Sequence, residues 1–136
     1  MATGTENKLK HLELIQNIIT RMANNSFLLK GWNLTILAAL IGLNKDGLDE
    51  KVIFISFILI FVFWMLDAYY LAQERIFRAR YDEVRIKQED NIDFSMKLDG
   101  KKTAKMDWFI VFYSMPLSLL YIGLIGSLGL SAYFLK

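Results

Sequence analysis

Two long stretches without charge constrain this chain more than any other feature of its sequence. Residues 52–66 contain no Asp, Glu, Lys or Arg, and neither do residues 108–135. An apolar stretch of about 18 or more residues is long enough to cross the hydrocarbon core of a bilayer, which is about 30 Å thick. A soluble protein of 136 residues would have to bury both stretches, and too little chain remains to cover them. The sequence therefore predicts an all-α integral membrane protein.

We expect three transmembrane helices in a single membrane domain, residues 1–136, at positions 27–43, 52–72 and 108–135. Lys30 lies near one end of the first helix, where its aliphatic stem can stay in hydrocarbon while the ammonium group reaches the headgroups. The third helix is longer than a perpendicular crossing needs. We expect it to tilt, to kink at Pro116 or to extend beyond the bilayer.

The distribution of basic residues predicts the orientation. The connection 44–51 holds two basic and three acidic residues. The segment 73–106 holds nine basic residues: Arg75, Arg78, Arg80, Arg85, Lys87, Lys97, Lys101, Lys102 and Lys105. The N-terminal tail adds Lys8, Lys10, Arg21 and Lys30. Because basic residues stay on the cytoplasmic side, we expect a cytoplasmic N-terminus, a cytoplasmic basic segment and an external C-terminus.

Residues 6–23 are predicted to form an amphipathic helix. Its apolar stripe repeats at spacings of three and four, through Leu12, Ile15, Ile19 and Met22. Such a stripe can lie on the bilayer surface or contact the same helix in neighbouring subunits. Surface-lying helices usually carry more Lys and Arg than this one does, so the composition favours contact between subunits of a homo-oligomer.

The second transmembrane helix is expected to continue into the cytoplasm, because residues 69–88 contain no Gly or Pro. Two readings of this basic extension stay open. It can be a solvated ladder of ion pairs, as between Glu74 and Arg78. In an oligomer it can instead collect guanidinium groups and aromatic rings around one axis, an arrangement suited to phosphate chains and unpaired bases. The candidate ligand-binding residues are Arg75, Arg78, Arg85, Phe77, Tyr81, Lys8 and Lys10.

Polar residues within the transmembrane segments are the other candidates for function. Asp67 is costly in lipid, so it is expected either to pair with Lys30, to face water at the helix end, or to serve a pore or proton site. Asn33 and Thr35 are further candidate pore residues. Small residues four apart in the third helix, Gly123, Ser127 and Ser131, favour close helix association.

Enzymatic activity is not expected. The chain has no cysteine and a single histidine, His11, so one chain cannot assemble a metal cluster or a Ser–His pair. No metal or cofactor is expected. We expect His11 to be an ordinary exposed residue of the 6–23 helix.

One stretch resembles a known family. The run from Trp64 to Arg85, WMLDAYYLAQERIFRARYDEVR, resembles a segment of the RipA-like small oligomeric membrane proteins of bacteria. Residues 32–35 (WNLT) and 93–96 (DFSM) are also similar, so the likeness covers roughly residues 30–96. Within that group, the chain looks most like the Hailong-type effectors of anti-phage defence.

The resemblance implies a function. It implies a homotetrameric channel that depolarises the bacterial inner membrane. It also implies a ligand, a single-stranded oligodeoxyadenylate made by a nucleotidyltransferase-like partner protein, that holds the channel shut within crossed helices.

Two other functions remain open from the residues alone. One is a non-conducting oligomeric scaffold that docks cytoplasmic partners through residues 73–106. The other is a small proton-coupled transporter that depends on Asp67.

Overall fold

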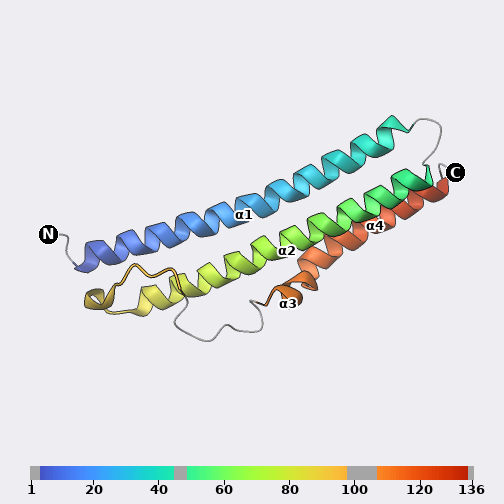
Figure 1. The fold of residues 1–136 in the computed structure, drawn as a ribbon. Coiled ribbons are helices and arrows are strands. Elements are labelled where there is room, and N and C mark those ends of the chain that lie inside the picture. Colours follow the sequence, from blue (N-terminus) through green and yellow to red (C-terminus); the bar gives the residue numbers. More distant parts are fainter. Residues whose placement is uncertain (1–3, 45–48, 98–106, 135–136) are drawn as a thin grey trace.

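The computed structural model describes residues 4–44, 49–97 and 107–134, and these form helices with no strand among them. Two long helices lie side by side in opposite directions, and a third helix packs along the first half of the second (Figure 1). The elements are α1 (Gly4–Leu43), α2 (Glu50–Ile86), the 3-10 turn η1 (Glu89–Asn91), α3 (Trp108–Phe112) and α4 (Met115–Phe134). The beginning of α1 and the end of α4 lie at opposite ends of the molecule.

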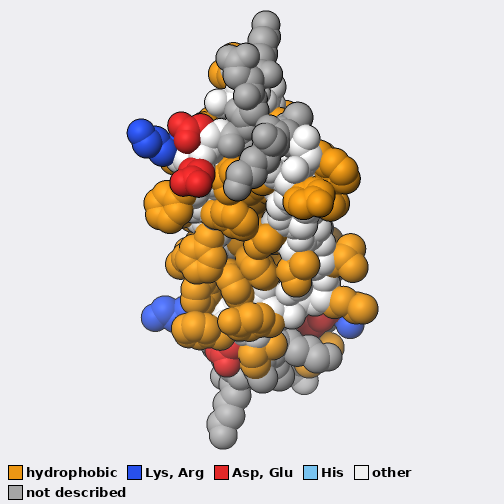
Figure 2. All heavy atoms as spheres, turned by 90° about the vertical axis from the view of Figure 1, so that its right-hand side faces the viewer, with side chains coloured by type: hydrophobic (Ala, Val, Ile, Leu, Met, Phe, Trp, Pro, Cys, Tyr) orange, Lys and Arg blue, Asp and Glu red, His pale blue; other side chains and the backbone are white. Residues whose placement is uncertain are grey.

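Three helices, α1, α2 and α4, are long and apolar enough to cross a membrane. Large apolar side chains project outward from them, including Phe54 (66% exposed) and Leu119 (74% exposed). Figure 2, which views the molecule from the end that holds the α1–α2 turn, shows apolar side chains over much of the visible surface. Lipid solvates such side chains and water does not, so this surface suits a bilayer.

Both long helices exceed the thickness of a bilayer. At 1.5 Å per residue, the 40 residues of α1 extend about 60 Å, roughly twice the hydrocarbon thickness. We call residues 31–43, 50–66 and 115–134 the apolar end. We call residues 4–25 and 73–97, which contain most of the charged groups that the structure describes, the charged end.

The structure differs from the expected boundaries of the first two helices. The predicted 6–23 and 27–43 helices are one uninterrupted helix, α1. The residues between them include no Gly or Pro, and Ser26 is buried against α2, so nothing ends the helix there. The expected continuation of the second transmembrane helix is confirmed, since α2 extends to Ile86.

The third predicted transmembrane helix is divided into α3 and α4. The chain breaks its helix at Tyr113 and Ser114, just before Pro116. Pro116 is the second residue of α4, where the backbone N–H groups have no partner within the helix, so the missing N–H costs no hydrogen bond.

The apolar stripe of the first half of α1 packs inside the chain. Ile15 and Ile19 form a buried cluster with Val84 of α2, and Leu12 packs against its margin. The preference for contact between subunits is therefore wrong for this stripe. The physical reason is the length of α2, which extends alongside α1 and covers the stripe within a single chain.

We expect Ile15→Ala to destabilise the charged end by about 2–4 kcal/mol, because it leaves a cavity at a fully buried position. Thermal unfolding of the protein in detergent measures the loss. Leu14→Ala is the matched control, since Leu14 is 41% exposed on the same helix. Equal losses in the two variants would contradict the packing described here.

Candidate functional site

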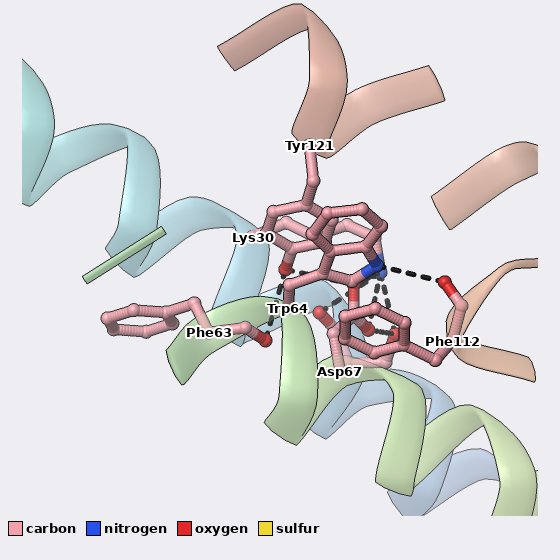
Figure 3. Close-up of polar contacts among 7 residues, drawn as sticks. Lys30, Phe63, Trp64, Asp67, Phe112 and Tyr121 are labelled. Atoms are coloured by element: carbon pink, nitrogen blue, oxygen red, sulfur yellow. Dashed lines mark hydrogen bonds and ion pairs between the residues drawn. The ribbon is translucent and has the colours of Figure 1, made fainter. Parts of the chain in front are cut away.

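A polar cluster lies where the apolar end meets the charged end, and its centre is Asp67 of α2 (Figure 3). The Asp67 side chain is fully buried. Lys30 Nζ of α1 lies 2.7 Å from Asp67 Oδ1 and 2.6 Å from Oδ2. Ser26, one helical turn before Lys30, donates its hydroxyl hydrogen to Asp67 Oδ1, and its Oγ accepts from Lys30 Nζ at 2.7 Å. The expected ion pair is present, and the serine completes it.

The third helix reaches the same carboxylate. The hydroxyl group of Tyr121 in α4 lies 3.2 Å from Asp67 Oδ2 and 3.3 Å from the carbonyl oxygen of Phe63. Tyr121 is itself fully buried. Asp67 therefore joins α1, α2 and α4 at one point.

The contacts around Asp67 explain how a charge is tolerated at this depth. Removing a carboxylate and an ammonium group from water costs several kcal/mol per ion, and attraction between them offsets this only when further hydrogen bonds complete the geometry. Both Asp67 oxygens have such partners, and the Lys30 side chain keeps 29% of its surface exposed. The arrangement is that of a structural ion pair, while a pore or proton role for Asp67 stays a prediction.

An aromatic stack supports the cluster from the α3–α4 side. The ring of Trp64 lies 4.4 Å from that of Phe112 and 5.6 Å from that of Tyr121, and both pairs are nearly parallel, at 12° and 5°. The Trp64 indole N–H donates to the Phe112 carbonyl oxygen at 3.0 Å. That carbonyl is at the end of α3, where helical carbonyls lack partners within the helix. The stack thus holds the break between α3 and α4 against α2.

The two other polar residues predicted within the membrane have different surroundings. Thr35 is exposed, and its hydroxyl group donates back to the Gly31 carbonyl at 2.9 Å. Asn33 is only 1% exposed, and neither its Nδ2 nor its Oδ1 has a partner within the described ranges. A buried amide without partners is unfavourable, so Asn33 is a position where water or another group would be stabilised.

The predicted basic residues of α2 lie on the outside of the charged end. Arg78 pairs with Glu74 at 2.7 Å and stays 62% exposed. Arg85 lies 3.7 Å from Asp82, and both side chains are about two-thirds exposed. Arg75 is half-buried and has interactions of its own.

The aromatic candidates point into the α1–α2 interface more than towards solvent. Phe77 and Tyr81 both pack against the cluster of Ile15, Ile19 and Val84. Tyr81 also lines a surface hollow of about 270 Å³, together with Gln16, Ile19, Arg78 and Asp82. This hollow is the place where the structure brings a predicted arginine and a predicted ring together.

The two lysine candidates at the start of α1 have different surroundings. Lys8 donates to the Lys87 carbonyl oxygen at 2.8 Å, and Lys10 is exposed. Lys101, Lys102 and Lys105 of the expected basic segment lie outside the described residues.

Two residues of the charged end differ most from expectation. His11, expected to be exposed, is fully buried, because residues 92–97 fold back over it. Arg80, which was not among the site candidates, is also fully buried and contacts Glu83 and Asp93. A long basic residue within a run of exposed ones carries no signal of burial, so sequence reasoning missed it. No group of three or more His, Cys, Asp or Glu side chains in the described ranges is placed to hold a metal ion.

Comparisons with known protein families, with curated proteins and with solved structures found no match for this chain.

We expect Lys30→Met to destabilise the protein by about 3–5 kcal/mol, because it leaves the Asp67 carboxylate buried without a counter-charge. Unfolding in detergent measures this loss. The double variant Lys30→Met/Asp67→Leu removes both charges and is expected to lose less than the single variant. A double variant as unstable as Lys30→Met, or more so, would show that the pairing of charges is not what the cluster contributes.

Proposed function

We propose that this chain is the subunit of a homo-oligomeric ion channel whose conduction is regulated by an anionic, nucleotide-like ligand. The observation that carries the proposal is the continuity of α1 and α2. Each helix extends without interruption from the charged end to the polar cluster around Asp67. A ligand that moves the charged end therefore displaces the membrane end of the same rigid elements.

The exposed guanidinium groups support an anionic ligand. Arg85 forms an ion pair with Asp82 in which both side chains are exposed, and such surface pairs contribute about 0–1 kcal/mol. A phosphate chain can replace Asp82 as the partner of Arg85, because charge-assisted bonds from arginine to phosphate are strong. Arg78 keeps its bond to the nearly buried Glu74, and its guanidinium group, in a side chain that is 62% exposed, can bind a phosphate in addition. The hollow beside Tyr81 offers room for a base next to Arg78.

Assembly from several subunits is supported by the glycines of the apolar end. Apart from their chain neighbours and the backbone of their own helix, Gly31 and Gly42 of α1, and Gly123, Gly126 and Gly129 of α4, have no described heavy atom within 4 Å of where a Cβ would lie. These backbone surfaces are open to close approach by another helix in lipid. A chain with three candidate membrane spans encloses little interior, so a water-filled path requires several copies around an axis.

The finer features of the proposal follow from the family resemblance. They are a tetramer in the bacterial inner membrane, with a cytoplasmic charged end and an external C-terminus. The ligand is a single-stranded oligodeoxyadenylate supplied by a nucleotidyltransferase-like partner. The ligand keeps the channel closed, and its loss depolarises the membrane in phage defence.

Liposome flux recording, paired with the mass of the detergent-solubilised complex, tests the proposal. We expect a stable oligomer, ion flux through it, and a decrease of that flux when single-stranded oligodeoxyadenylate is added. Arg78→Glu should raise the ligand concentration for half-maximal effect about tenfold or more, because it removes one charge-assisted contact.

The matched control is Lys51→Glu, which changes an exposed basic residue at the other end of α2. It should leave the response to ligand unchanged. An oligomer that leaves liposomes tight with and without ligand would instead indicate the non-conducting scaffold. A monomer would contradict both functions.

A further inference from the structure

The connection after α2 folds back onto the charged end. Its described part, residues 88–97, lies beside the start of α1 and the end of α2 (Figure 1), and we call it the strap. Ile92 and Met96 of the strap pack against the cluster of Ile15, Ile19 and Val84. The strap is thus docked against both long helices.

One backbone carbonyl holds the strap to both helices. The Ser95 carbonyl oxygen accepts from Arg80 Nε of α2 at 2.9 Å and lies 3.1 Å from His11 Nε2 of α1. A carbonyl oxygen only accepts hydrogen bonds, so Nε2 must carry a proton. The Nδ1 atom of the neutral ring is then unprotonated. It is buried and has no partner in the part of the chain that the structure describes.

A second proton on His11 is incompatible with this arrangement. It would place an N–H at buried Nδ1 without an acceptor, which costs about 1–3 kcal/mol or more. It would also place two cations close together, because Arg80 Nε and His11 Nε2 share one acceptor and lie at most 6.0 Å apart, the sum of 2.9 and 3.1 Å.

The charged groups around His11 do not compensate for the positive charge that a second proton would bring. From α2, Arg80 binds Glu83 at 3.2 Å, and from the strap it binds Asp93 at 3.3 Å, so both carboxylates are engaged by the guanidinium. From α1, Lys8 adds a positive charge three residues before His11. The Phe94 ring, centred 5.4 Å from the imidazole, contributes no counter-charge.

The docked strap also has a strained backbone conformation at one residue. Phe94 has a φ angle of 51°, in the left-handed region that is unfavourable for a large side chain. This strain favours release once the bonds to Ser95 weaken.

We propose that His11 is a pH-sensitive latch: the neutral imidazole keeps the strap docked on α1 and α2, and its protonation releases the strap. The neutral imidazole supplies this stabilisation, which decreases as the pH falls into the range where histidine side chains take up a second proton. The connection after α2 also binds the start of α1, since Thr5 donates to Glu89 and Lys8 donates to the Lys87 carbonyl oxygen. Release of the strap weakens this attachment and so frees the charged end of α1. The latch does not depend on ion conduction.

Asp93 is a titratable group of the strap itself. The backbone N–H of Ser95 lowers the pKa of Asp93 below the model-compound value of 3.8. A lowered carboxyl pKa adds stability above that value, and this stability is lost only as the pH falls below it. The contribution of Asp93 is therefore intact at pH 5.5.

Hydrogen exchange of the full-length protein in detergent tests the latch. We expect protection of the amides of residues 92–97, corrected for the intrinsic pH dependence of exchange, to fall about tenfold between pH 8 and pH 5.5. The factor reflects one proton that binds only the released form, which decreases protection by up to about tenfold per pH unit. Amides of α2 in the apolar end should keep their protection.

Two variants at position 11 make the test specific. His11→Gln keeps an N–H donor but does not titrate, so its strap should show no change in protection between the two pH values. His11→Arg is charged throughout, and its strap should be unprotected even at pH 8. The proposal is overturned by a wild-type strap that is unprotected at pH 8 or indifferent to pH. A pH response retained in His11→Gln, a protected strap in His11→Arg, or equal loss across α2 would overturn it as well.

Discussion

Asp67 places a carboxylate where neither lipid nor bulk water can solvate it, and the helices converge on that group. Lys30 and Ser26 reach it from α1 and Tyr121 reaches it from α4, so one charge determines the register of three helices. Apolar contacts alone fix helix positions weakly in a bilayer, because lipid tails are as apolar as the side chains they replace. A buried charge with specific donors excludes the sliding and rotation that lipid would otherwise permit.

Different interactions stabilise the two ends of the α1–α2 hairpin. In the apolar end, outward-facing side chains such as Phe54 form a surface that suits lipid. In the charged end, water solvates the outer faces, and the interior cluster of Ile15, Ile19 and Val84 is stabilised by burial of apolar surface. Because both helices are continuous, the ends cannot move independently without bending a helix.

Sequence reasoning succeeded where the pattern is local and failed where the fold brings distant segments together. The continuation of α2 followed from helix propensity, and the pairing of Lys30 with Asp67 was one of the alternatives that the cost of charge in lipid left open for Asp67. Ser26 and Tyr121 were missed, since a serine or tyrosine in an apolar helix gives no sign of its partner. The burial of His11 depends on a segment more than 80 residues away, at Ser95, which no periodicity within α1 can predict.

The strengths of the polar contacts indicate where this molecule can respond to its surroundings. The Asp67 carboxylate is fully buried and multiply bonded, so displacing Lys30 leaves that charge without a counter-charge in an apolar environment. The exposed pair of Arg85 and Asp82 exchanges partners at little cost. The contacts of the Ser95 carbonyl oxygen are intermediate in strength. Its two donors, from Arg80 and His11, are compatible only while the imidazole is neutral. A stimulus acting on the charged end therefore meets weaker or conditional contacts, whereas the contacts around Asp67 are the more costly ones to break.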